Sequence, residues 1–171
     1  MPIKRAFHQG LSRLAAKWPA LSRRLVASFN PIESATVPWH PVRKPLAQSR
    51  LALVTTAGVH HRRQQPFDMQ DSQGDPSFRV IDGQTIAADY NITHDYYDHR
   101  DADRDLNIVF PITRLKEMAA AGCIGKVADE HFSLMGHIDG RHVHTLMDRT
   151  TPEIVRRLKA AGVDYVLLTP A

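Results

Sequence analysis

The densest group of side chains that could do chemistry is an acidic, histidine-containing tract at residues 94–105, HDYYDHRDADRD. Clustered carboxylates can receive a cationic or amino-group substrate, and an imidazole beside them can move a proton. We therefore assign Asp98, His99 and Asp101 as candidate catalytic residues, and Asp103 and Asp105 as candidate substrate-binding residues.

A metal ion is one alternative for this tract. Its aspartates imitate the start of a calcium-binding loop, but Leu106 stands where the loop needs Gly and Ile112 where it needs Glu. His94 and His99 with a carboxylate could hold a transition metal, although a spacing of five does not put both rings on one helical face. A solvated loop held by salt bridges is the main alternative to a substrate site. We predict no metal site.

A second candidate site follows an apolar run that begins at Leu51. Thr55 and Thr56 end this run, and His60 follows the turn at Gly58. A histidine there could act as a general acid or base, and the hydroxyls could bind a substrate. We assign His60 as catalytic and Thr55 and Thr56 as substrate-binding, with a histidine that only caps a polar loop as the alternative.

Other motifs exclude several functions. The single cysteine, Cys123, follows a predicted helix, whose carboxyl end raises a thiol pKa, so we expect a buried, inert thiol. One cysteine also excludes an internal disulfide. The glycines at residues 122–125 lack both the spacing and the Lys-Ser or Lys-Thr pair of a phosphate-binding loop, so nucleotide binding is unsupported.

The net charge of +4 is unevenly distributed. The first fifty residues hold nine bases and one acid, a net of +8, whereas the rest hold thirteen bases and seventeen acids, a net of −4. The folded body is therefore not predicted to bind nucleic acid. No apolar stretch approaches the roughly 18 residues of a membrane span, so we predict no integral membrane segment. The single cysteine fits a reducing compartment, and we predict a cytoplasmic protein.

Residues 1–48 are predicted to form a basic helical extension and a proline-rich connector. Apolar residues recur every three or four positions and form the stripe of an amphipathic helix, which Pro19 should break. The stripe consists of Phe7, Leu11, Leu14, Trp18, Leu21 and Leu25. Docking on the body or on a partner is the main interpretation, with a mitochondrial-type presequence and membrane-surface binding left open.

Residues 49–171 are predicted to form an α/β domain with a mostly parallel sheet and flanking helices. The expected strands are 51–58, 78–81, one near 85–88, 106–110 and 165–168; the expected helices are 113–121 and 151–161, the second capped by Thr151; 59–76 is expected to be a loop. The last strand should be buried on both faces, with chemistry just beyond its carboxyl end, near Ala171.

Four segments resemble one family. They are LVTTAGVHHRRQQPFDM (53–69), GDPSFRVI (74–81), HDYYDHRDADRDLNIVFPITRL (94–115) and GVDYVLLTPA (162–171). Their residues and order are similar to the selenoprotein B family of glycine, sarcosine, betaine and D-proline reductases, especially its short bacterial members. The resemblance covers essentially the whole chain.

The resemblance implies reductive cleavage of a C–N bond. In that family the strand matching 166–170 leads into a selenocysteine or cysteine, two further residues and a cysteine, and the selenolate is the nucleophile. We expect this motif to follow Ala171, with its UGA codon read as a stop, so the chain as written lacks its nucleophile and should be inactive alone and prone to associate. No cofactor is expected in this chain itself. The resemblance implies two partners, a subunit that carries a pyruvoyl group and a thiol electron donor. It is also compatible with a homo-oligomer of this chain.

Two further hypotheses stay open. One is a non-catalytic α/β protein that binds a small ligand or a partner. The other is a hydrolase or lyase that uses His and Asp residues with a metal.

Overall fold

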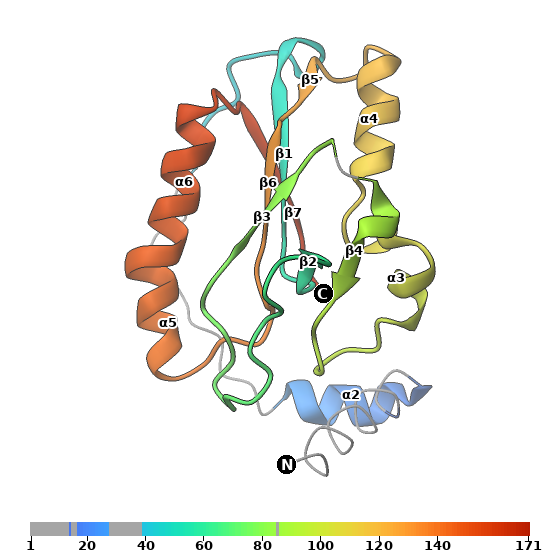
Figure 1. The fold of residues 1–171 in the computed structure, drawn as a ribbon, viewed down its shortest axis with the longest axis vertical. Coiled ribbons are helices and arrows are strands. Elements are labelled where there is room, and N and C mark those ends of the chain that lie inside the picture. Colours follow the sequence, from blue (N-terminus) through green and yellow to red (C-terminus); the bar gives the residue numbers. More distant parts are fainter. Residues whose placement is uncertain (1–13, 15–16, 28–38, 85) are drawn as a thin grey trace. The chain divides into compact units, whose positions relative to one another are not determined.

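The computed structural model describes residues 14, 17–27, 39–84 and 86–171 (Figure 1). The chain forms two compact units. Met1–Arg43 and Asp95–Asp98 form the first unit, and Lys44–His94 and His99–Ala171 form the second. The domain boundary predicted after residue 48 stays a prediction.

The described helix of the first unit is α2, Pro19–Val26. Proline is suited to the first position of a helix because its fixed φ is helical and no intrahelical bond needs its missing N–H. This start agrees with the predicted break at Pro19. The predicted stripe at Phe7 and Leu11 lies outside the described residues. In the part of the chain that the structure describes, no helix has the length and apolarity to cross a bilayer.

Within the described residues, the second unit is built on a five-stranded sheet. Its strands are β1 (Arg50–Thr55), β3 (Arg79–Asp82), β5 (Lys126–Val127), β6 (Glu130–Ser133) and β7 (Tyr165–Thr169). β1 pairs in parallel with β7 along one side and with β5 and β6 along the other, and β3 joins β6 antiparallel. The predicted α/β class with a mostly parallel sheet and flanking helices is confirmed.

Helices cover both faces of this sheet (Figure 1). On one face lie α5 (Arg141–Thr145), a π-helical stretch (Leu146–Thr150) and α6 (Thr151–Ala160); α4 (Ile112–Ala120) lies on the other. The short α3 (Arg100–Arg104) and 3-10 turns at Leu46–Gln48, Ala87–Asp89 and Leu106–Ile108 complete the helical elements. β2 (Val59–His61) and β4 (Tyr90–Ile92) form a separate antiparallel pair.

The core on the α6 face contains Ala52, Ala128, Phe132, Ile154 and Leu158, with Val54 packed against it. Side chains alternate along a strand, so Thr55 lies on the opposite face of β1, toward α4. This alternation decides which strand-end side chains share one side of the sheet.

His131 completes the hydrogen bonding of the central strand. The strand pairing along this side of β1 is interrupted between β5 and β6. In this gap the N–H of Leu53 donates to Nδ1 of His131, 2.9 Å away. Because Nδ1 accepts this bond, the ring proton lies on Nε2, which is buried without a hydrogen-bond partner among the described residues. His131 is therefore a structural histidine that is held neutral.

Several predicted elements are wrong. Residues 106–110 form no strand, because the Asp105 side chain accepts the Asn107 N–H and caps a 3-10 turn instead. The strand expected near 85–88 occurs later, as β4, and the predicted loop at 59–76 opens with β2. The predicted cap Thr151 is inside a helix that continues from the π-helical stretch, and Thr150 Oγ1 donates to the carbonyl of Pro76.

β7 confirms the predicted terminal strand but not its predicted burial. Val166, Leu167 and Leu168 are 41%, 38% and 68% exposed. In the described structure β7 pairs only with β1, so its other edge is unpaired as well. The strand from Tyr165 to Thr169 also carries no charge or proline, the residues that normally protect such an edge.

We expect the 171-residue chain to associate with a second copy through β7. Antiparallel pairing about Leu167 is self-complementary, because Val166 of each copy then faces Leu168 of the other. Sedimentation should show a mass that rises with concentration, and a Val166→Lys, Leu168→Lys double variant should remain monomeric. Val155→Lys, at an exposed apolar position on α6, is the control and should associate like wild type. A monodisperse wild-type monomer would contradict this prediction.

Candidate functional site

Three parallel strands end at one level of the sheet with hydroxyl side chains. Thr55 of β1 is in register with Ser133 of β6 on one side and with Thr169 of β7 on the other. In-register residues of neighbouring strands share a face, so the three hydroxyls form a row at the carboxyl edge. This edge is where open α/β sheets place their ligands.

Thr55 joins the elements of this edge. Its Oγ1 lies 2.9 Å from the Val109 carbonyl and 3.1 Å from the Thr169 carbonyl, and it accepts the Ala57 N–H. The side chain is fully buried and its hydrogen-bonding capacity is used. In contrast, Ser133 Oγ and Thr169 Oγ1 are buried without a partner among the described residues, which leaves capacity for a water or a ligand.

A rim of four residues surrounds the end of β7. The Thr56 N–H donates to the Thr169 carbonyl, and Thr56 Oγ1 accepts the Ala171 N–H at 3.1 Å. A Cβ placed on Gly136 would lie 2.9 Å from the Ala171 carbonyl oxygen and 3.0 Å from His94 Nε2. Thr56, His94, Gly136 and Ala171 therefore meet at one point, which we call the rim.

His94 is a buried member of the rim. Its Nε2 accepts the Gly136 N–H at 3.1 Å, which fixes the Nδ1–H tautomer. From the sequence, His94 is a candidate only as a metal ligand, because its approach to Gly136 depends on tertiary structure. The only sequence signal is its position at the start of the acidic tract.

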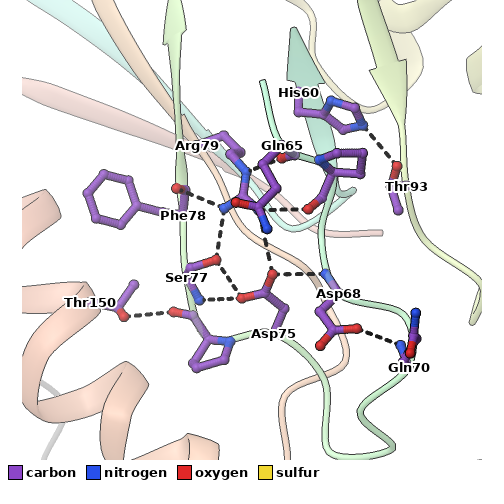
Figure 2. A network of polar contacts seen from close by, with 12 residues as sticks. His60, Gln65, Asp68, Gln70, Asp75, Ser77, Phe78, Arg79, Thr93 and Thr150 are labelled. Atoms are coloured by element: carbon purple, nitrogen blue, oxygen red, sulfur yellow. Dashed lines mark hydrogen bonds and ion pairs between the residues drawn. The ribbon is translucent and has the colours of Figure 1, made fainter. Parts of the chain in front are cut away.

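His60 lies on β2 and is buried. Its Nδ1 is 3.0 Å from the His61 carbonyl and its Nε2 is 2.8 Å from Thr93 Oγ1 (Figure 2). A carbonyl only accepts, so Nδ1 carries the proton and the Thr93 hydroxyl donates to Nε2. Burial, partly opposed by the bond to the His61 carbonyl, lowers the pKa of His60 below its usual value. The ring is thus held neutral, and it orients Thr93.

His60 and Thr93 line a cleft of about 390 Å³ between β2, β4 and α3. Its polar residues are His60, Arg62, Asn91, Thr93 and Asp103; its apolar residues are Pro66, Tyr90, Ile92, Ala102 and Leu106. The next residue after Thr93 is His94. The wall of the cleft and the rim are therefore adjacent along the chain.

The acidic tract is divided rather than gathered in the structure. Asp103 lines the cleft and lies 2.8 Å from His99 Nδ1. Asp101 instead pairs with Arg104 on the surface, and Asp105 accepts two bonds from Asn107. Those bonds lower the pKa of Asp105. Asp98 belongs to the first unit, so the predicted set is not assembled in one unit.

An arginine network supports the cleft wall (Figure 2). Arg79 donates to the Gln65 and Pro66 carbonyls, and its guanidinium lies 4.2 Å from the Phe67 ring centre. It also lies 3.5 Å from Asp75. Burial would raise the pKa of Asp75, but hydrogen bonds from Ser77 and Asp68, with the charge of Arg79, hold it below its usual value. The network fixes the loop that contributes Pro66 to the cleft.

Cys123 is exposed, so the prediction of a buried thiol is wrong. It lies between α4 and β5, and β5 pairs with Arg50 and Leu51 at the amino end of β1. The thiol is therefore at the opposite edge of the sheet from the rim. Among the described residues, no group of three or more His, Cys, Asp or Glu side chains is arranged to hold a metal.

Comparison with known protein families finds one family that matches most of the chain. The family described as glycine/sarcosine/betaine reductase selenoprotein B matches residues 26–171. The chain belongs to this family. That agrees with the resemblance of the four sequence segments, three of which contribute residues to the cleft or the rim.

Three relatives of this selenoprotein B family member show how much of the protein is shared. The D-proline reductase subunit gamma of Acetoanaerobium sticklandii is 40% identical over 131 residues, 77% of this chain and 52% of the relative. The glycine reductase complex component B subunit gamma of Carboxydothermus hydrogenoformans is 31% identical over 78% of this chain and 30% of the relative. The betaine reductase complex component B subunit beta of Peptoclostridium acidaminophilum is 29% identical over 74% and 29%.

The chain thus spans about half of the first relative and under a third of the other two. No solved structure matches it.

Proposed function

We propose that this chain is a component of a selenol- or thiol-dependent reductase that cleaves the C–N bond of a small amino acid such as glycine, sarcosine, betaine or D-proline. The observation that carries the proposal is the carboxyl edge, where β1, β6 and β7 end together beside His94 and a cleft lined by His60 and Asp103. Family membership supports the reaction class.

The proposed reaction balances with a dithiol as reductant. The C–N bond takes up two electrons and two protons and becomes a C–H and an N–H bond, while two thiols become a disulfide. The Asp103 carboxylate can hold the cationic nitrogen, and the neutral His60 keeps the Thr93 hydroxyl in one orientation. Thr55 and Thr56 hold the strand ends at which the reacting groups would meet.

We further propose that a selenocysteine or cysteine follows Ala171 in the full-length product and supplies the nucleophile. Ala171 is held at the rim by Thr56, beside His94, whereas Cys123 lies at the far edge of the sheet. The remaining parts of the reaction are proposed to come from partners in the cytoplasm. These are a subunit that carries a pyruvoyl carbonyl for the substrate amine and a thiol electron donor. The relatives' names, which describe subunits of reductase complexes, support a partner subunit.

The native gene product tests this proposal. We expect the coding DNA to carry TGA (UGA in the messenger RNA) directly after the Ala171 codon, followed in frame by two further codons and then a cysteine codon. Mass spectrometry of the native protein should then show a chain longer than 171 residues with about one selenium atom. The longer product, supplied with its partner subunit and a dithiol, should release amine from its substrate, and the 171-residue chain should not.

Two outcomes would contradict the proposal. A native chain that ends at Ala171 after an ordinary stop codon and still turns over substrate would exclude a nucleophile beyond the rim. A native protein that binds an amino acid without any turnover would identify the non-catalytic binding protein of the second hypothesis.

A further inference from the structure

The cleft contains one cation and one carboxylate. Arg62 and Asp103 are its charged lining residues, because His60 is held neutral. Arg62 follows β2 directly, and its backbone N–H bonds the Asp89 carbonyl. Its guanidinium is exposed and makes no ion pair with any described residue. The arginine therefore presents a full set of donors to a ligand.

The carboxylate of the cleft is only partly used. Asp103 Oδ2 bonds His99 Nδ1, and its side chain remains 48% exposed. Within the described structure its Oδ1 makes no hydrogen bond. Asp103 can therefore receive a positively charged nitrogen while His99 holds the other oxygen in place.

This pair of charges selects a class of ligand. A simple anion such as phosphate would meet Asp103, and a simple cation would meet Arg62. A zwitterion satisfies both, and a guanidinium matches a carboxylate with two parallel hydrogen bonds. The apolar side chains of Ile92 and Leu106 leave room for the methyl or ring carbons of such a ligand.

We propose that Arg62 binds the carboxylate of the substrate and that Asp103 binds its nitrogen, so that these two residues orient the C–N bond in the cleft. The assignment rests on the proposed function, since it takes an amino acid as the substrate. It adds Arg62, which no sequence motif marks, and it gives the acidic tract a defined role at one position, Asp103.

Arg63 provides a matched control. It is the same residue type, one position along the chain, and it lines a neighbouring cleft with His61 and Asp82 but does not line this one. Arg62 also borders that neighbouring cleft, so a comparison of the two arginines separates the effects of the two clefts. A substitution at either position alters an exposed side chain and should leave the fold intact, which thermal melting checks.

The test is calorimetric binding to the full chain. The probes are glycine, sarcosine, betaine and D-proline, each beside its carboxamide, which keeps the cationic nitrogen but lacks the carboxylate charge. We expect wild type to prefer one free amino acid over its amide by about tenfold or more, the effect of one charge-assisted bidentate bond. Arg62→Gln should remove that preference and Arg62→Lys should retain part of it. Arg63→Gln should keep the preference for the free amino acid. Asp103→Asn should weaken binding of the amino acid but not binding of acetate.

The outcomes separate this assignment from the proposed function. If wild type binds one of the amino acids and Arg62→Gln binds it equally well, the assignment is wrong and the function stands. If wild type binds none of the four, the substrate class is wrong and the assignment falls with it. An equal loss in Arg63→Gln and Arg62→Gln would place the carboxylate in the neighbouring cleft and overturn the assignment.

Discussion

Gly58→Ala is expected to lower the free energy of unfolding by roughly 2–5 kcal/mol, the sum of a left-handed backbone penalty and overpacking. Gly58 has φ +70°, which side-chain-bearing residues rarely adopt. A Cβ there would also lie well inside 3.0 Å of the Thr93 carbonyl oxygen. That neighbour is backbone, and the Thr93 N–H bonds the Gly58 carbonyl, so neither segment can move aside without losing this bond.

Gly122→Ala is the matched control for Gly58→Ala. Gly122 has φ +72°, but a Cβ there would meet no atom within 4 Å. Only the backbone penalty of about 1–2 kcal/mol should remain. Urea denaturation measures both variants, and equal losses would show that contact with Thr93 contributes nothing. Gly58→Ala should also weaken ligand binding in the cleft, because it displaces the residue that His60 orients.

Elements with strong local signals were predicted from the sequence. The apolar run at Leu51 and the run at Tyr165 became β1 and β7, and both lie in parallel as expected. The helix before Gly162 ends at a positive φ of that glycine, as a helix stop requires. Hydrophobic pattern and glycine position determine these features over a few residues, so one sequence suffices.

The incorrect predictions concern segments whose structure or burial depends on competing local bonds or on tertiary contacts, which a hydrophobic pattern does not reveal. The composition of residues 106–110 predicts a strand. The hydrogen bond from the Asn107 N–H to the Asp105 side chain instead favours a turn. β7 has the apolar content of a buried strand, but the burial of its side chains depends on what covers its two faces, which a sequence pattern does not show. The exposure of Cys123 likewise depends on where α4 ends relative to β5.

The candidate site was only partly predictable for the same reason. Thr55, Thr56 and His60 were found because strand ends of an α/β sheet carry chemistry. The acidic tract was treated as one cluster, whereas its members fall into different surroundings and even into different units. His94 and Arg62 acquire their positions through contacts with residues distant in sequence or through the shape of the cleft, and neither has a motif.

The second large effect is a loss of stability in mild acid, caused by His131. Burial, with a smaller contribution from the charge of Lys116, lowers the pKa of His131 from 6.5 to about 4. Between these values the unfolded chain binds a proton that the folded chain does not. Stability is therefore fully present above pH 6.5 and is lost as the pH falls toward 4, by about 3 kcal/mol at completion. Urea denaturation from pH 7.5 to 4 measures this loss.

His131→Asn isolates the contribution of His131 to that loss. The Asn carbonyl can still accept the Leu53 N–H, so the sheet keeps its bond, but the side chain does not titrate. We expect a lower stability at pH 7, because the ring leaves a cavity, and a smaller fall toward pH 4 than in wild type. His144→Asn, at an exposed position, controls for the removal of a histidine elsewhere. An unchanged fall in His131→Asn would assign the acid sensitivity to other groups, among them the buried His60, whose pKa is also lowered.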